Sequence, residues 1–518
     1  MAKDPTDMRR TARTALTTVA AALVAISTLT ACGGAQPSGS TAPSGGSQTS
    51  ASPHASATPP WCPTLDTHRV DCGTVERDLV PGDPDLGTIR VAYARIQRTD
   101  LDSPAAGTIL PNPGGPGVPL IEHADMALAA VDGDLLTDHD LLLIDPRGTG
   151  LSTPLDCGVP DRDFLTLPRD EQRRTATHCG ELLGPRAAGY TSAATVDDFD
   201  AVRTELGIPK VVLYGISYGT YLLPVYAQRH PDHVQSMVLS GAYPHDFDTL
   251  NRPNAEAVSL ALQRICDRGG VCDGAAAVAD LRAVNARLRT DPLPVPAERP
   301  FTLTEDKFAS LLFEAATSGV GSDPDPVLGT VPAALRAAVR GDDAPLRAFA
   351  VRAATSPVME NIDLYLAVAC NDYPTIWSPD APVAEREQRY RRAVAAAGEA
   401  GAFSAAGFSA AQRDGGDICL GWPATTRIDH AAQPLPDVPV LVLSGDLDAI
   451  TPDANGVRVA AKFPRATFVS VPNVGHVPDL VPGGCVSGLV TTFLRTGTPG
   501  ATDCVRSIAP IPVTPVTD

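Results

Sequence analysis

A serine that could act as a nucleophile lies in the segment Gly215-Ile216-Ser217-Tyr218-Gly219. Glycines two residues before and after a serine are typical of a sharp turn between a buried strand and a helix, on which the hydroxyl stands exposed. The flanking residues fit this setting, because 210–214 form a short apolar, β-branched run and 220–231 form an apolar run of helical length. The pattern alone is a weak signal, but its setting indicates that Ser217 attacks a carbonyl carbon.

A serine hydroxyl needs a base that removes its proton and an acid that orients the base. Both follow later in the chain, in the order serine, aspartate, histidine that α/β-hydrolases use. One apolar run is followed by a loop with Asp446 and Asp448, and a second run is followed by a loop with His476. We therefore predict a triad of Ser217, His476 and Asp448. Asp446 is the alternative acid, but it comes very soon after its strand, and we expect it instead to accept hydrogen bonds from backbone amides in the turn.

The attack of a serine on a carbonyl creates an oxyanion, which backbone amides must stabilise. The amide of Tyr218, directly after the nucleophile, is one expected donor. The second donor must come from a loop after an early strand, and the segment NPGGPG at 112–117 follows such a strand. Glycines there let the backbone approach the substrate closely. Gly114 and Gly115 are both candidates for this second amide, with Gly115 preferred.

The elements that must position these residues recur at the spacing of an α/β protein. Residues 88–98 alternate between apolar and polar side chains, as an outer antiparallel strand does. The stretch 194–206 has the length of a helix between strands. Further short apolar runs predict strands at 107–111, 140–145, 210–215, 234–240, 438–444 and 466–471. The prediction is an α/β-hydrolase fold, with a mostly parallel sheet and helices on both of its faces.

Residues 246–405 differ from the rest, because they are rich in Ala, Arg, Leu and Asp and have helical periodicity. We interpret them as a helical cap inserted between two halves of the core, 61–245 and 406–518. Such a cap would cover the carboxyl-terminal edge of the sheet, where α/β proteins bind their ligands.

The N-terminal residues predict export. Three arginines precede an apolar stretch at 15–29, which is too short to cross a membrane comfortably and suits a signal peptide at 1–31. The sequence Leu29-Thr30-Ala31-Cys32 resembles a bacterial lipoprotein signal, in which Cys32 receives the lipid; cleavage as a plain secretory peptide is the alternative. Residues 32–60 are poor in charge and rich in small residues and proline, as a flexible tether is.

Ten cysteines besides Cys32 indicate five disulfides in an exported chain. The sequence does not determine their connectivity, and we expect pairing in order along the chain, because each pair then closes a local loop. Neither a C-x-x-C nor a His-x-x-x-His motif occurs, so we expect no metal site and no cofactor. The net charge of −19 argues against nucleic acid and anionic lipid as partners, so we expect the lipid alone to hold a monomer at the membrane.

The motifs together resemble a known family. NPGGPG (112–117), DPRGTGLS (145–152), GISYG (215–219), GDLDAITP (445–452) and NVGHVP (473–478) come in the order of prolyl aminopeptidase-type α/β-hydrolases. The cysteines, with CND at 370–372 and CLGWP at 419–423, narrow the resemblance to secreted tripeptidyl aminopeptidases and related mycobacterial cell-envelope serine hydrolases. The resemblance covers 61 to about 505 and implies a serine exopeptidase that releases tripeptides from free N-termini. Prolyl aminopeptidases commonly have histidine where Asn112 stands.

An aminopeptidase must hold a protonated α-amine, and a fixed carboxylate does this directly. Asp372 in the cap is our first candidate for that role, with a helix or loop cap as the alternative, and Glu360 is a weaker candidate. Trp422 is expected near the floor of the site, either packed there or stacked on substrate. Asp145 and Arg147 are expected to form an internal ion pair that braces the oxyanion loop.

The same triad would also serve a carboxylesterase without an amine pocket. A solute-binding lipoprotein would leave the triad order unexplained, and the dehalogenases and epoxide hydrolases of this fold use an aspartate at the position of Ser217.

Overall fold

The computed structural model describes residues 58–516, except 132, 160, 162–163, 356–359, 414 and 425. Its centre is an eight-stranded sheet with the strand order β1-β2-β4-β3-β5-β6-β11-β12. The strands are β1 (Val70–Val80), β2 (Asp83–Ile96), β3 (Gly107–Asn112), β4 (His139–Ile144), β5 (Val211–Ile216), β6 (Val234–Ser240), β11 (Val440–Gly445) and β12 (Ala466–Val471).

Six strands from β4 to β12 run parallel, and β2 pairs antiparallel with both β1 and β4. The predicted outer antiparallel strand and the six predicted apolar strands are therefore confirmed, with bounds that shift by at most two residues, except for five at the start of β2. β1 was not predicted. The fold is that of an α/β-hydrolase. The chain adds β4 on one side of β3 and then β5 on the other side, so the order of the strands changes direction at β3.

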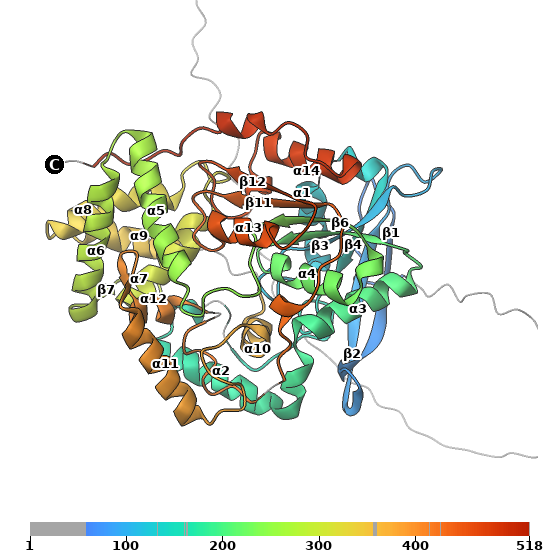
Figure 1. Cartoon of the computed structure of the whole chain (residues 1–518), viewed down its shortest axis with the longest axis horizontal. Helices are drawn as coiled ribbons and strands as arrows, with labels where there is room; N and C mark the ends of the chain where they lie inside the picture. Colours follow the sequence, from blue (N-terminus) through green and yellow to red (C-terminus); the bar gives the residue numbers. More distant parts are fainter. Residues whose placement is uncertain are drawn as a thin grey trace, which may run out of the picture. The chain divides into compact units, whose positions relative to one another are not determined.

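Alternate residues of the parallel strands pack on opposite faces of the sheet. One face packs against α3 (Ser192–Glu205), α4 (Gly219–Arg229) and α13 (Asp453–Ala460). The other face packs against α1 (Ala124–Ala130) and α14 (Cys485–Thr496). Figure 1 shows α3, α4 and α13 in front of the strands and α1 and α14 behind and above them. The predicted three-layer arrangement is thus confirmed.

Two groups of helices form the cap. The first has an apolar core of its own and includes α5 (Arg252–Gly269), α6 (Gly274–Thr290), α7 (Glu305–Ser310), α8 (Val331–Val339), α9 (Ala344–Ala354) and α12 (Ala405–Ala411). Two short hairpins, β7 (Leu293–Val295) with β8 (Phe301–Leu303) and β9 (Glu399–Ala400) with β10 (Phe403–Ser404), belong to the same region. The second group is α2 (Arg169–Leu183), α10 (Ile362–Asp372) and α11 (Val383–Ala397).

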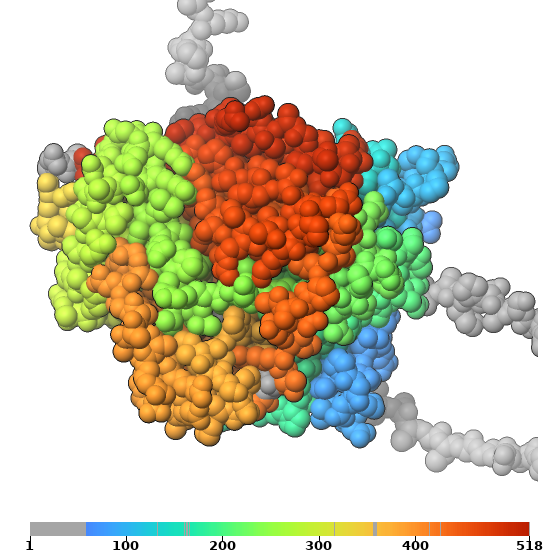
Figure 2. Space-filling model, in the orientation of Figure 1, coloured from blue at the N-terminus to red at the C-terminus, as the bar shows by residue number. Residues whose placement is uncertain are grey.

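The first helix group extends a few residues past the predicted end of the cap at residue 405. Helix α12 begins there, and its Phe408 and Ala411 belong to the apolar core of the first helix group. Helix α2, from the first half of the core, packs on α10 of the insertion. The cap therefore includes helices from both sides of the predicted insertion, because helices that are distant in sequence pack against one another. Figure 2 shows the first helix group, in yellow-green, lying against the C-terminal core half in red and orange.

Five disulfides join the ten cysteines in order along the chain, as expected: Cys62–Cys72, Cys157–Cys179, Cys266–Cys272, Cys370–Cys419 and Cys485–Cys504. Disulfides persist in oxidising compartments.

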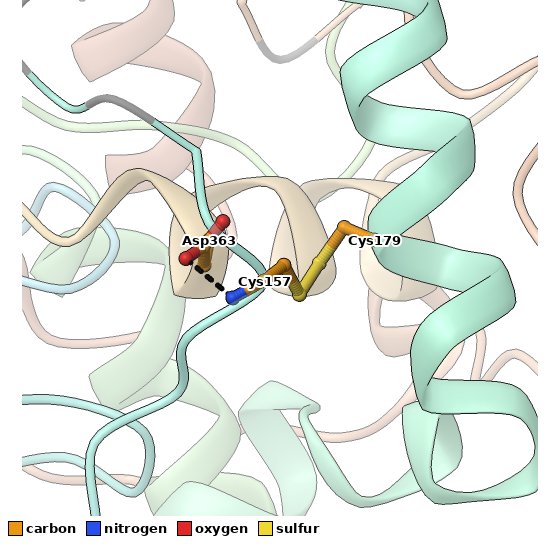
Figure 3. Close-up of side chains that lie close together, drawn as sticks. All are labelled: Cys157, Cys179 and Asp363. Atoms are coloured by element: carbon orange, nitrogen blue, oxygen red, sulfur yellow. Dashed lines mark hydrogen bonds between the residues drawn. A yellow bond between two sulfur atoms is a disulfide. The ribbon is translucent and has the colours of Figure 1, made fainter.

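One of these bonds helps to fix α10 of the cap. Cys157–Cys179 ties the loop after β4 to α2, and Asp363 of α10 accepts a hydrogen bond from the Cys157 amide at 2.8 Å (Figure 3). Burial, with the charges of Asp161 and Asp156, raises the pKa of Asp363 to about 6. The helix that carries Asp372 is thus held to the core by a disulfide-bonded loop.

Within the described part of the chain, no helix combines the length and apolar character needed to cross a membrane. The predicted signal peptide, the lipidation site Cys32 and nearly all of the predicted tether lie outside the described residues.

Candidate active site

Ser217 stands on the turn between β5 and α4, where the backbone is forced into an unfavourable conformation. Its φ of 54° is in the left-handed region, which residues other than glycine rarely adopt. Its amide donates to Ser240 O at 3.0 Å, and its carbonyl accepts from the Thr220 amide at 2.8 Å. The turn is thus fixed on both sides, and strain of this kind is concentrated at functional sites.

The glycines of the pattern are explained by close backbone contacts. A Cβ on Gly215 would lie 2.5 Å from Gly219 O, and one on Gly219 would lie 2.2 Å from Asn112 O. Both distances are below any normal contact, so only glycine allows β5, α4 and the end of β3 to approach this closely. The G-x-S-x-G pattern is therefore a nucleophile elbow in this structure.

The acid and the base of the predicted triad are in contact. Asp448 follows β11 and is 2% exposed; its Oδ2 lies 2.8 Å from His476 Nδ1. Burial alone would raise the pKa of Asp448, but the charge of His476 and hydrogen bonds from His476 and Thr451 outweigh it and lower the pKa. An ionised Asp448 at this position can orient the imidazole and stabilise its protonated form.

His476 packs on the backbone of Gly241, which lies beside the nucleophile turn. That residue follows Ser240, whose carbonyl holds the Ser217 amide. A Cβ on Gly241 would lie 3.0 Å from His476 Cε1, so the imidazole packs directly on this backbone. The structure thereby brings Ser217, Asp448 and His476 to one edge of the sheet, as the sequence predicted.

Thr451 is a part of this site that the sequence analysis missed. Its hydroxyl donates to Asp448 Oδ2 at 2.5 Å and lies 3.0 Å from His476 Nδ1. Asp448 Oδ1 also accepts from the Ile450 and Thr451 amides, at 2.7 and 3.0 Å. These bonds fix the carboxylate in one orientation. The position of Thr451 three residues after the acid was a usable signal, since a short polar side chain there can bond back to the acid.

Asp446 has the structural role that was expected of it. Its Oδ1 accepts from the Asn473 amide at 2.8 Å, and its Oδ2 pairs with Arg268 of α5 at 2.5 Å. It thus holds the loop after β11 to the loop after β12 and to the cap.

Two further residues support the histidine loop. Thr317 of the cap accepts from the His476 amide at 3.1 Å, and its hydroxyl accepts from the Ala449 amide at 3.4 Å. Asp479 is 4% exposed and accepts hydrogen bonds from the hydroxyls of Tyr214 on β5 and Ser240 on β6. The cap and the strands beside the nucleophile therefore jointly position the base.

The loop predicted to supply the oxyanion hole lies against the nucleophile turn. A Cβ on Gly114 would lie 3.0 Å from both Ser217 Cβ and Tyr218 N. The Gly114 amide itself donates to Asn112 Oδ1 at 3.2 Å, which leaves Gly115 as the preferred second donor beside Tyr218. Asn112 thus has a local structural use at the position where prolyl aminopeptidases have histidine.

Asp145 braces this loop, but not through the predicted ion pair with Arg147. Asp145 accepts from the amides of Leu120 and Ile121, at 2.7 and 3.0 Å. Arg147 pairs instead with Asp198 of α3, at 2.7 Å. The predicted ion pair is wrong, because Asp145 bonds to backbone amides that follow the oxyanion loop and Arg147 pairs with a carboxylate of α3.

Comparison with known proteins agrees with this geometry. Family models match residues 107–283 as "alpha/beta hydrolase fold" and residues 404–505 as "TAP-like protein". Carboxylesterase B of Mycobacterium tuberculosis is 30% identical over 473 residues, which is 84% of this chain and 86% of that protein. The chain belongs to the α/β-hydrolases with a TAP-like C-terminal region.

Two relatives of this TAP-like hydrolase are named as peptidases. The serine protease Hip1 of M. tuberculosis is 25% identical over 480 residues, covering 82% of this chain and 85% of that protein. The tripeptidyl aminopeptidase of Streptomyces lividans is 31% identical over 198 residues, covering 35% of this chain and 37% of that enzyme. The chain therefore spans little more than a third of the aminopeptidase that it matches.

Glu360 of the TAP-like hydrolase lies beside the oxyanion loop. A Cβ on Gly115 would be 3.3 Å from Glu360 Cβ, and the next residue, Asn361, donates its amide to Gly117 O at 3.0 Å. The Glu360 carboxylate pairs with Arg413 at 2.6 Å, and Arg413 also pairs with Glu314, at 3.1 Å. Two glutamates of the cap thus meet at one guanidinium next to the reacting centre.

Asp372, our first candidate for binding an amine, has a structural partner. Its Oδ2 accepts from the amide of Ser192, the first residue of α3, at 2.5 Å, and Ser192 Oγ bonds the Tyr218 hydroxyl at 2.8 Å. Burial raises the pKa of Asp372 to about 6 although the bonds from Ser192 oppose it. A carboxylate at a helix N-terminus is favourable, so the contacts favour the alternative reading of Asp372 as a helix cap.

Trp422 is only 3% exposed, and its Nε1 donates to Asn371 Oδ1 at 2.8 Å. A Cβ on Gly180 of α2 would lie 2.9 Å from its ring. These contacts give Trp422 a packing role between α2 and α10, and the prediction of a substrate-stacking role is not supported by its position.

Proposed function

We propose that this serine hydrolase is an exopeptidase that cleaves peptides from their free N-termini and releases tripeptides. The observation that carries the proposal is the position of Glu360, a cap carboxylate that packs against the oxyanion loop. Relatives named as a serine protease and a tripeptidyl aminopeptidase support the same reaction class. The substrate is a peptide, and none of the proposed steps needs a cofactor.

The proposed reaction has two halves. His476 takes the proton of Ser217 as the hydroxyl attacks the scissile carbonyl, and Asp448 stabilises the resulting imidazolium. The amides of Tyr218 and Gly115 bind the oxyanion. His476 then gives the proton to the leaving amine, and a water that His476 activates hydrolyses the acyl-enzyme.

The distance between the two ends of a tripeptide explains why its amine belongs in the cap. Three extended residues span about 10 Å, so the α-amine of a tripeptidyl group cannot lie at Ser217. Glu360 is on the segment that leads into α10, on the cap side of the oxyanion loop. An ammonium group bound there forms a charge-assisted hydrogen bond, as a free N-terminus requires. We assign Glu360, supported by Glu314, to this role.

A carboxylesterase is the second candidate function. Carboxylesterase B of M. tuberculosis aligns over 84% of this chain, far more than the Streptomyces aminopeptidase does. An esterase would use the same triad and oxyanion hole, and it would not depend on Glu360.

Three substrates separate the two functions: a free-amine tripeptidyl anilide, its N-acetylated twin and a short-chain aryl ester. We expect the free-amine anilide to be cleaved far more efficiently than the other two substrates, which should react slowly but measurably. Longer peptides should lose intact tripeptides, as followed by mass spectrometry. The Glu360→Gln variant should lower kcat/KM for the free-amine anilide by roughly 10- to 100-fold, because one charge-assisted hydrogen bond is lost. The glutamine still accepts a hydrogen bond from Arg413, so the other two substrates should react as before.

Asp372→Asn is the matched control, since it neutralises the other candidate carboxylate. A selective loss for the free-amine anilide in Asp372→Asn would move the amine site to Asp372. An equal loss for all three substrates in Glu360→Gln would give Glu360 only a positioning role. Turnover of the ester without turnover of either anilide would contradict the peptidase and favour the carboxylesterase.

We also propose that the enzyme is exported and held at the outer face of the cell membrane by a lipid on Cys32. The five disulfides support an extracytoplasmic location, because such bonds persist in oxidising compartments. In a bacterial host, the unmodified chain should partition into detergent and incorporate labelled fatty acid. The Cys32→Ala chain should do neither, and equal labelling of both chains would contradict the anchor.

A further inference from the structure

A cluster of one carboxylate and two imidazoles lies at the other end of α4 from the nucleophile. Asp200 is on α3, His230 directly follows α4, and His233 ends the short turn after it. One potential ligand atom from each lies within 4.8 Å of the other two. The side chains are 14%, 20% and 36% exposed respectively, so the cluster is accessible from solvent.

The two oxygens of Asp200 have different surroundings. Oδ1 accepts from Arg203 Nε at 2.6 Å, from the Tyr226 hydroxyl at 2.8 Å and faces His233 Nδ1 at 2.8 Å. Oδ2 has only longer contacts, with Arg203 Nη2 at 3.3 Å and His230 Nδ1 at 3.6 Å. These contacts hold the carboxylate in one orientation, with Oδ2 turned towards His230.

The two ring nitrogens of His230 face two different carboxylates. His230 Nε2 lies 2.9 Å from Asp197 Oδ1, within hydrogen-bonding distance. When Nε2 donates this bond, Nδ1 can offer its lone pair to a metal ion, and Nδ1 faces Asp200 Oδ2 at 3.6 Å. A metal ion bound there would take the place of a proton on Nδ1. A carboxylate on the outer nitrogen of a ligating histidine is the usual support of a transition-metal site.

We propose that Asp200, His230 and His233 bind a divalent transition metal, with Zn²⁺ as the ion that best fits two imidazoles and one carboxylate. Neutral imidazole nitrogens and a carboxylate oxygen are common zinc ligands, and water supplies the fourth position of a tetrahedron. The two imidazoles select against Ca²⁺ and Mg²⁺, which prefer oxygen. The proposal does not depend on the peptidase function.

The neighbouring arginines limit the affinity of this site. Arg203 pairs with Asp200, and Arg229 pairs with Asp197 at 2.5 Å. Their positive charge opposes a second cation, so the ion must compete with them for the carboxylates. The bound ion would join α3 to the turn after α4, and we expect it to stabilise the fold without changing catalysis, because α4 separates it from Ser217.

The other group of potential ligands within the described residues carries no such site. Cys157, Cys179 and Asp363 lie together, but the two cysteines are joined in a disulfide (Figure 3). Their sulfurs are therefore unavailable as thiolate ligands.

Titration calorimetry with Zn²⁺ on full-length enzyme tests the proposal, with protein that carries no histidine tag and has been treated with a chelator. We expect one ion per chain, a rise in Tm with Zn²⁺ concentration, and visible Co²⁺ absorption of tetrahedral intensity. His233→Ala, which alters the most exposed ligand, should abolish all three signals. Asp197→Asn should weaken Zn²⁺ binding by about 10- to 100-fold, because it removes the carboxylate that orients His230.

His178→Ala is the matched control, because His178 is an exposed histidine on α2. It should bind Zn²⁺ as the unmodified chain does. The Tm of each variant without metal shows whether it folds. If His233→Ala does not fold, Asp200→Asn provides a second variant of a metal ligand. The absence of stoichiometric binding, or binding that survives in both ligand variants, would reduce the cluster to a network of ion pairs.

Discussion

Replacing Ser217 with alanine should lower kcat by about 10⁶-fold while the protein remains folded. The hydroxyl is the only group in the proposed mechanism that forms a bond to the substrate, and neither His476 nor Asp448 can take its place. A positive φ of 54° is similarly unfavourable for serine and for alanine, so the strained turn should persist and Tm should change little. Steady-state rates on the free-amine tripeptidyl anilide, with Tm measured in parallel, give the result.

Ser444→Ala is a matched control for this substitution. Ser444 is a buried serine near the end of β11, and its hydroxyl has no hydrogen-bond partner among the described residues. Its loss should leave kcat unchanged. A fluorophosphonate that labels the unmodified enzyme should also label Ser444→Ala and should fail to label Ser217→Ala. Rates or labelling retained in Ser217→Ala would show that another residue is the nucleophile.

The parallel core and the triad could be predicted because their signals are local. Buried parallel strands are continuous apolar runs, and each member of the triad lies on the loop or turn that follows one of them. The strand β1 gave no such signal, because polar and charged residues interrupt its apolar residues along a half-exposed length. A strand that faces solvent on much of its surface does not need an apolar run.

Contacts between distant segments could not be predicted from the same patterns. Thr317 holds both the acid loop and the base loop of the site, yet it lies 131 residues before Asp448 in a helical region without a motif. Asp200 and His233 are similar, since only the packing of α3 on α4 brings them together. A spacing rule detects ligands on one element, and these ligands come from two.

Asp372 and Trp422 show a different limit. Their residue types fit substrate binding, and the motifs around them strengthened that interpretation. The structure shows that both make internal hydrogen bonds, to Ser192 and to Asn371 respectively. A polar side chain in a cap can serve the substrate or the fold, and only its partners show which role it has.

Replacing Asp448 with asparagine should lower kcat by about 10⁴-fold, and replacing Asp446 with asparagine should cost far less. Asp448 Oδ1 accepts from the Ile450 and Thr451 amides, so the amide oxygen of asparagine will occupy that place. The NH₂ group will then face His476 Nδ1 and donate to it, which places the ring proton on Nε2. In that tautomer His476 cannot accept the proton of Ser217.

Asp446 lies two residues earlier on the same loop, but its carboxylate bonds the Asn473 amide and Arg268, whereas the carboxylate that contacts His476 Nδ1 is that of Asp448. Asp446→Asn should therefore lower Tm and leave kcat within about tenfold, since it alters only the support of the loops. The measurement is kcat and KM of both variants on one substrate. The ratio of their kcat values decides the assignment, because both substitutions remove one carboxylate from the same loop. A larger loss of kcat in Asp446→Asn than in Asp448→Asn would mean that Asp446 is the acid of the triad.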